Sequence, residues 1–137
     1  MNHITNQREK RWQYLNGLLN EQTSIYLQIA QMIENDILRG IYQEEEQVPS
    51  TNELARVFCI NPATAAKGVN LLVDEAILYK KRGIGMFVST GAVAAIRQKR
   101  KAAFYQDFVK ALVSEAENLE IDKNELLEMI QKAQSEQ

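Results

Sequence analysis

Residues 48–75 read VPSTNELARVFCINPATAAKGVNLLVDE and predict two short helices joined by a tight turn. The spacing of Ser50 and Glu53 is that of a capping box, which marks the start of the first helix. Asn61 and Pro62 mark the start of the second, because asparagine caps helices well and proline at the first helical position loses no hydrogen bond. The turn is too short for the helices to pack in parallel, so they must cross steeply, as in a helix-turn-helix.

The segments on either side extend this pair into a larger domain. Apolar residues at helical spacing from Ser24 to Arg39 predict a preceding helix. Between Ile77 and Ser89 the spacing of apolar residues changes from that of a helix to that of β-strands, and glycines lie in the middle of this segment. A β-hairpin directly after the second helix of a helix-turn-helix is a wing. We therefore predict a winged helix-turn-helix domain over residues 23–90, in a mostly helical chain of the α+β class.

Beyond the wing, residues 91–137 are predicted to form a short helical hairpin with an apolar stripe. Its second helix begins at Asp122, which has capping-box spacing with Glu125. Two helices alone cannot bury so many apolar side chains, and a two-fold homodimer is the simplest way to cover them. The predicted dimer interface consists of Phe104, Phe108, Leu112, Leu126 and Ile130.

The N-terminal extension, residues 1–22, carries a weaker pattern and allows two interpretations. It is either docked on the domain or partly disordered, or else Arg8, Lys10 and Arg11 form a basic arm that touches DNA. The pattern does not decide between the two.

Bulk composition limits the classes of function. The 137 residues are 45% hydrophobic and 25% charged, as is typical of soluble globular proteins. No apolar run is long enough to span a bilayer, and the N-terminus lacks the apolar core of a signal peptide, so we expect a cytoplasmic protein. Cys59 is the single cysteine and His3 the single histidine, so no disulfide, metal site or cofactor is expected. Between Phe58 and Ile60, the thiol is expected to be packed and inert.

The start of the second helix is the predicted base-reading element. A net charge of −2 does not attract DNA, so any contact must come from local clusters. Asn61, Ala63 and Thr64 are small, so the backbone can approach base edges, and Lys67 can reach a guanine or a phosphate one turn further on. The alternative is that Lys67 is simply a solvated helix residue.

The wing supplies the second set of predicted contacts. Its centre holds Lys80, Lys81 and Arg82, followed by Gly83 and Gly85. The cations are predicted to contact phosphate or the minor groove, and the glycines permit close approach of the backbone. In the alternative interpretation, the lysines only protect an exposed edge strand from aggregation.

The start of the first helix of the pair supplies a third set. Ser50, Thr51 and Asn52 lie where exposed N–H groups and the helix dipole favour a phosphate. Ser50 is either a DNA ligand or fully occupied as the helix cap.

Several motifs resemble those of the GntR family of bacterial transcription regulators. They are Ile25-Tyr26-Leu27-Gln28-Ile29, Val48-Pro49-Ser50, Glu53-Leu54-Ala55, Ile60-Asn61-Pro62-Ala63-Thr64 and Gly83-Ile84-Gly85-Met86-Phe87-Val88, in the order and spacing of the family. The Asn-Pro-x-Thr opening and the short helical tail are similar to the YtrA-like branch. The resemblance implies a winged helix-turn-helix, dimerisation through the C-terminal part and binding to an inverted-repeat operator.

Three positions depart from the family pattern. Many members carry arginine where this chain has Asn52, and others carry arginine at the positions of Pro62 and Ala66. Asn52 can still bind a phosphate through its amide, and Lys67 matches the basic position favoured in the YtrA-like branch. An operator sequence therefore cannot be transferred from arginine-bearing relatives.

These observations predict a sequence-specific transcriptional regulator, a repressor, whose partners are double-stranded DNA and a second copy of itself. An enzyme is not expected, because the chain has no Ser/His/Asp or Cys/His set and no phosphate-binding glycine loop before a helix. A small-molecule effector is not expected either, because residues 92–137 are too few to enclose a drug-sized pocket. The alternative is a winged helix that binds only protein, and a steep salt dependence of duplex binding separates the two.

Overall fold

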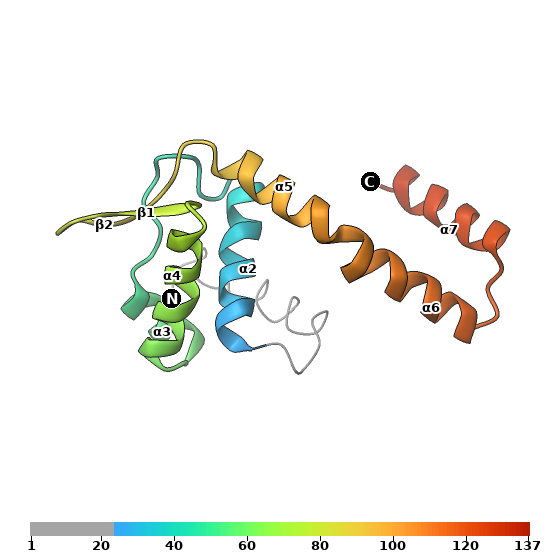
Figure 1. Ribbon diagram of the computed structural model, residues 1–137, viewed down its shortest axis with the longest axis horizontal. Coiled ribbons are helices and arrows are strands. Elements are labelled where there is room, and N and C mark those ends of the chain that lie inside the picture. Colours follow the sequence, from blue (N-terminus) through green and yellow to red (C-terminus); the bar gives the residue numbers. More distant parts are fainter. Residues whose placement is uncertain (1–23) are drawn as a thin grey trace. The chain divides into compact units, whose positions relative to one another are not determined.

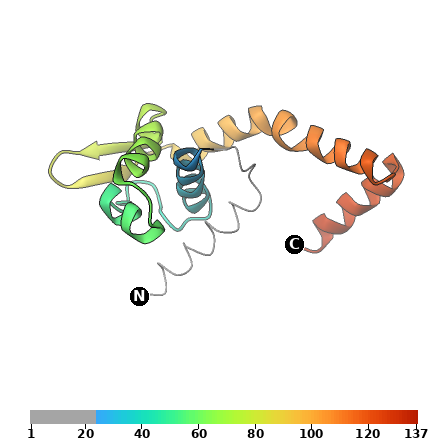
Figure 2. The same ribbon diagram turned by 90° about the horizontal axis from the view of Figure 1, so that it is seen from below.

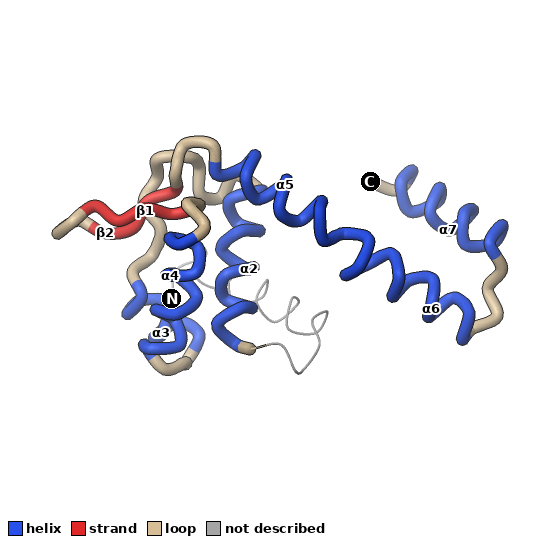
Figure 3. Tube along the Cα trace, in the orientation of Figure 1, coloured by secondary structure: helices blue, strands red, loops and turns tan. Residues whose placement is uncertain are grey.

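The computed structural model describes residues 24–137 of the chain. The interpretations of residues 1–22 therefore lie outside the described residues. The elements in order are α2 (Ile25–Leu38), α3 (Thr51–Phe58), α4 (Pro62–Asp74), β1 (Leu78–Lys81), β2 (Gly85–Val88), α5 (Ala92–Phe104), the π-helical turn η1 (Tyr105–Val109), α6 (Lys110–Asn118) and α7 (Lys123–Ser135) (Figures 1 and 3). The predicted fold class, a mostly helical chain with a two-stranded wing, is confirmed.

The chain divides into two compact units, with the boundary after Ile96. The first unit contains α2, α3, α4, the hairpin and the beginning of α5, where Ala92 and Ile96 are fully buried in the core. The second unit contains residues 97–137. The core of the first unit therefore extends beyond the hairpin into the next helix.

Local capping explains where α3 and α4 begin. The Ser50 Oγ accepts a hydrogen bond from the Glu53 N–H at 3.1 Å, and the Asn61 Oδ1 accepts one from the Ala63 N–H at 2.8 Å. Between the helices, Cys59 adopts a left-handed backbone with φ of 54° and turns the chain. Both predicted helix starts are confirmed. The expectation that Cys59 is packed is wrong, because its place in this turn leaves the side chain exposed.

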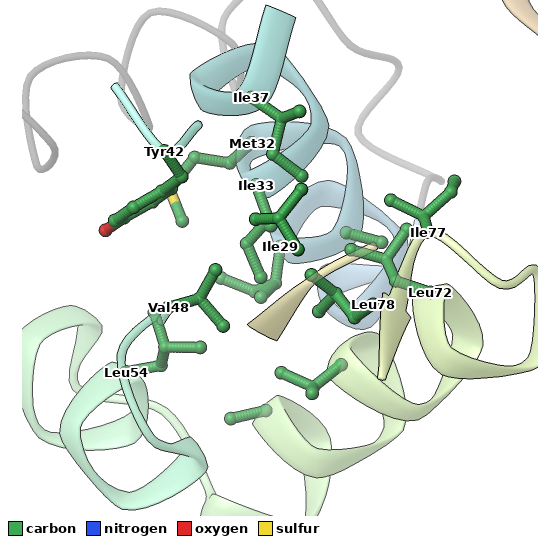
Figure 4. Packing of buried hydrophobic residues seen from close by; sticks show 14 of the residues in the cluster. Ile29, Met32, Ile33, Ile37, Tyr42, Val48, Leu54, Leu72, Ile77 and Leu78 are labelled. Atoms are coloured by element: carbon green, nitrogen blue, oxygen red, sulfur yellow. The ribbon is translucent and has the colours of Figure 1, made fainter. Parts of the chain in front are cut away.

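The core of the first unit is enclosed by α2, α3 and α4, and α4 packs against both of the other helices (Figures 1 and 2). Figure 4 shows side chains from α2, α3, α4 and β1 gathered in one cluster. The helical spacing of apolar residues predicts an inward face for α3 and for α4, and its members are buried except Val73, which is half-buried. They are Leu54, Ala55 and Phe58 in α3, and Ala65, Val69 and Leu72 in α4.

Gly68 allows α2 and α4 to approach closely. A Cβ atom at this position would lie 2.7 Å from the carbonyl oxygen of Tyr26, closer than atoms can pack. Glycine inside a helix costs roughly 0.5–1 kcal/mol relative to alanine. Here the close contact of the two helices offsets that cost.

The wing is an antiparallel hairpin in which Leu78 pairs with Val88 and Tyr79 pairs with Phe87. Residues 45–48, which we call the bracing segment, lie along the other edge of β2. The N–H of Val48 donates to the carbonyl of Met86 at 3.0 Å, and Gln47 forms an isolated bridge with Phe87. The polar composition of residues 43–47 predicts a loop, but the last residues of this stretch instead extend the sheet of the wing.

The second unit consists of helices separated by a reversal of the chain between α6 and α7 (Figure 3). Glu120 adopts a left-handed backbone with φ of 56°, and the Asp122 Oδ1 accepts a hydrogen bond from the Glu125 N–H at 2.9 Å. The predicted start of the last helix is confirmed. Within residues 97–137, all of which the structure describes, Ala116 is the one residue that is buried.

Candidate nucleic-acid interface

The N-terminal end of α4 is exposed and lined by small side chains. Asn61, Pro62 and Ala63 are exposed and Thr64 is half-buried. The Asn61 side chain is occupied as the helix cap, so it shapes the start of α4 through its hydrogen bond to Ala63. Such an end allows the backbone of a helix to approach another surface closely.

Lys67, one turn further along α4, is exposed but has a partner within the protein. Its Nζ lies 4.1 Å from the centroid of the Tyr26 ring on α2. An ammonium over the face of an aromatic ring is attracted by the ring quadrupole. This contact restricts the Lys67 side chain, which is therefore more than a freely solvated lysine. The apolar spacing of residues 24–39 predicts that Tyr26 lies on the apolar face of its helix, and it does not indicate this contact with Lys67.

The cations of the wing are exposed at its tip. Lys80, Lys81 and Arg82 are all exposed, and the Nζ of Lys81 lies 4.2 Å from the centroid of the Phe87 ring. Gly83 has φ of 77° and nothing within 4 Å of the position a Cβ would take. The wing tip is therefore a tight turn that carries positive charge and has open space on one side.

The start of α3 offers fewer polar groups that are free to bind DNA than the start of α4 and the wing tip do. The Ser50 hydroxyl oxygen already accepts the hydrogen bond of the cap. Thr51 is half-buried and Asn52 is exposed. In both Figure 1 and Figure 2, α3, α4 and the hairpin lie to the left of α2. The structure thus places all three predicted contact elements in the first unit.

A carboxylate of the bracing segment is attached to the wing and to the segment after it. The Tyr79 hydroxyl donates to the Glu45 Oε2, and the Thr90 Oγ1 donates to the Glu45 Oε1 at 3.0 Å. These hydrogen bonds, that from Tyr79 first, lower the pKa of the Glu45 carboxyl below its ordinary value. The same contact raises the pKa of the Tyr79 hydroxyl above its ordinary value. Glu45 therefore joins the bracing segment to the base of the wing and to Thr90.

Gln47 is the other contact of the wing that the sequence did not indicate. Its side-chain Nε2 donates to the carbonyl oxygen of Ile84 at 3.0 Å. The space beside Gly85 is filled by this amide, because a Cβ on Gly85 would lie 2.5 Å from the Nε2. The two glycines of the wing thus differ: Gly83 faces open space, whereas Gly85 makes room for Gln47.

Among residues 24–137, no three side chains of histidine, cysteine, aspartate or glutamate lie together as metal ligands would. Within the same residues, every helix is too short or too polar to cross a bilayer.

Comparison with known proteins identifies the family. Residues 25–88 match the family profile of bacterial regulatory proteins, gntR family. The transcriptional repressor YtrA of Bacillus subtilis is 31% identical over 108 residues, which cover 79% of this chain and 82% of YtrA. The chain belongs to the GntR family. The similarity over most of both chains also confirms the resemblance to the YtrA-like branch. Several longer relatives match less completely, and the chain spans about 28% of their length.

Solved structures of GntR relatives have the same fold. A protein from Bacteroides thetaiotaomicron described as a GntR-family transcriptional regulator is 36% identical, with a TM-score of 0.63, and the match covers 82% of this chain and 97% of that one. BusR of S. agalactiae, solved in complex with its busAB promoter DNA, is 29% identical with a TM-score of 0.50. That match covers 80% of this chain and 58% of BusR.

Proposed function

We propose that this chain is a homodimeric transcriptional repressor that binds an inverted-repeat operator in double-stranded DNA. The observation that carries the proposal is the exposed, small-residue start of α4 with Lys67 beside it, in the same unit as a wing tip that carries Lys80, Lys81 and Arg82. BusR, a relative with this fold, binds promoter DNA. A repressor of this kind acts in the cytoplasm.

In the proposed complex, α4 and the wing have different tasks. The start of α4 enters the major groove, where Thr64 and Lys67 meet base edges, while Asn61 and Ala63 set how closely the helix approaches. The wing cations contact phosphates or the minor groove, and the backbone at Gly83 allows close approach. At the start of α3, Thr51 and Asn52 are the groups placed to bind a phosphate, because the Ser50 hydroxyl is committed to the cap.

The second unit provides the dimer interface in this proposal. Phe104, Phe108 and Leu112 are 55%, 63% and 46% exposed in the single chain, and the two phenylalanine rings lie 5.6 Å apart between centroids. On α7, Leu126 is half-buried and Ile130 is exposed. Apolar side chains so concentrated on one short segment are typical of a surface that a partner covers. A second copy of the chain would cover the apolar side chains around Phe108 and those of α7 at once. The resulting dimer would present two wings to two half-sites.

Titration of labelled duplex DNA at several salt concentrations tests the proposal. The promoter region upstream of the chain's own gene and a shuffled duplex of the same composition serve as the two probes. We expect tighter binding to the promoter and a logarithm of affinity that falls linearly with the logarithm of salt concentration. Absence of salt-dependent binding to either duplex would contradict the proposal and favour a winged helix that binds only protein.

A further inference from the structure

We propose that Gln47 is a positioning residue for DNA binding, which holds the wing tip in place relative to the start of α3. The inference rests on the proposed function and adds to it a residue that carries no charge and belongs to neither α4 nor the hairpin. Three independent observations support it.

The first observation is the hydrogen bonding of Ile84 at the wing tip. The Gln47 Nε2 donates to the Ile84 carbonyl oxygen at 3.0 Å, and the Ile84 N–H donates to the Lys81 carbonyl oxygen at 3.0 Å. Both backbone polar groups of Ile84 are therefore bonded within the protein. What the tip offers to a partner is the Ile84 side chain, which is 64% exposed, beside the cations of Lys81 and Arg82.

The second observation is the glycine that follows. Gly85 has φ of 144°, which residues with a side chain rarely adopt, and a Cβ there would lie 2.5 Å from the Gln47 Nε2. A side chain at this position would displace the amide from the wing. Gly85 is thus matched to the Gln47 side chain on one edge of β2.

The third observation is the position of Gln47 in the chain. Its backbone bridges to Phe87, and the next residue, Val48, donates to the Met86 carbonyl oxygen at 3.0 Å. Shortly afterwards Ser50 caps α3. One short segment therefore carries both the support of the wing tip and the start of the helix-turn-helix.

The physical consequence is preorganisation of the wing. A two-stranded hairpin alone is marginally stable in water, so a wing without support samples many positions. DNA binding would then have to order the wing, and this loss of entropy would weaken affinity. With Gln47 bonded to Ile84, the cations beside the tip keep their distance from α3 and α4 before DNA arrives.

The variant Gln47→Met tests this role, because it keeps the length of the side chain and removes the donor. We expect affinity for promoter and shuffled duplex to fall by about fivefold, the effect of one exposed hydrogen bond. The salt slope should stay unchanged, because no charge is lost. Gln47→Asn, which keeps the amide but shortens its reach, should behave in the same way. Gln43→Met, an exposed glutamine in the same loop, is the matched control and should bind as the unaltered protein does.

A double-mutant cycle separates positioning from direct contact. In a Lys80→Ala/Lys81→Ala/Arg82→Ala background the wing no longer carries its three cations, so Gln47→Met should cause little further loss of affinity. A full, additive fivefold loss in that background would overturn the proposal, because Gln47 would then act independently of the wing. Hydrogen exchange at the Ile84 amide provides a readout without DNA, and it should be faster in Gln47→Met than in Gln43→Met. Equal exchange in both variants would also overturn the proposal.

Failure of the inference is distinguishable from failure of the proposed function. If the unaltered protein shows no salt-dependent duplex binding, the proposed function is wrong, and the inference falls with it. If the unaltered protein binds and Gln47→Met binds equally well, the inference alone is wrong.

Discussion

The two units of this chain differ in how much apolar surface each can bury by itself. In the first, α2, α3, α4, the hairpin and the start of α5 surround a core in which Ile29, Ala65, Leu72 and Val88 have no exposed area. In the second, residues 97–137, Ala116 is the one buried residue, while Phe108 and Leu119 are more than half exposed. The first unit thus buries its apolar side chains within one chain, whereas the second leaves most of its large apolar side chains exposed in the single chain.

The largest expected effect is the loss of stability when a core residue of the first unit is replaced. Leu72→Ala removes a fully buried side chain of α4 from the core of the first unit. We expect the free energy of unfolding of the first unit to fall by about 2–5 kcal/mol, as for other buried leucines. Chemical denaturation followed by circular dichroism measures the loss. Leu127→Ala, at an exposed leucine of α7, is the control for stability of the first unit. An equal loss of unfolding free energy in both variants would contradict the claim that the first unit alone buries a core within one chain.

The next largest expected effect is the loss of dimer assembly and of operator affinity when a charge is placed on the exposed apolar face of the second unit. Phe108→Asp places a carboxylate where the proposed dimer interface would bury it. We expect monomers in sedimentation and an operator affinity weaker by about 100-fold or more, since one chain can engage one half-site. Gln106→Asp introduces the same charge at a polar residue of the same helical turn and should leave the dimer assembled. A Phe108→Asp protein that remains dimeric would remove this residue from the interface.

If the first unit recognises bases, replacing Lys67 should reduce sequence specificity, whereas replacing Lys110 in the second unit should not. Lys67→Met should narrow the difference between operator and shuffled DNA by roughly 1–3 kcal/mol per lost base contact. Lys110→Met is a close control, because this lysine of the second unit also lies over an aromatic ring, that of Tyr105, at 5.8 Å. Competition titrations with both duplexes measure the difference. Equal weakening on both duplexes in Lys67→Met would identify Lys67 as a phosphate ligand, with base reading left to Thr64 and to DNA shape.

The smallest expected effect concerns the wing and appears in the salt dependence. Lys81→Ala should weaken specific and shuffled DNA alike and reduce the salt slope by about 1 per lost contact, hence about 2 for a symmetric dimer. Lys132→Ala on α7 removes the same charge from the second unit and should leave the slope unchanged. A slope that is the same in both variants would show that Lys81 serves only to protect the edge of the hairpin.

Many features of the fold follow from residues close together in the sequence. Asn61 with Pro62 and Asp122 with Glu125 mark helix starts, because a cap and the N–H group it satisfies lie within one helical turn. The apolar spacing in α4 predicts its buried face correctly except at Val73, which is half-buried. The tight turn at Gly83 also follows from its immediate neighbours. Such features need no knowledge of the rest of the chain.

The contacts that organise the candidate site join residues that the sequence separates widely. Gln47 and Ile84 are 37 positions apart, and Glu45 and Tyr79 are 34 apart, so no periodicity or capping rule relates them. Lys67 finds the Tyr26 ring only because α2 and α4 pack together, and close packing of these helices needs Gly68. Helix starts and the hairpin could therefore be read from the sequence, because they depend on short-range hydrogen bonds and side-chain period. The support of the wing and the placement of Lys67 depend on which surfaces meet when the core closes, and only the folded chain determines that.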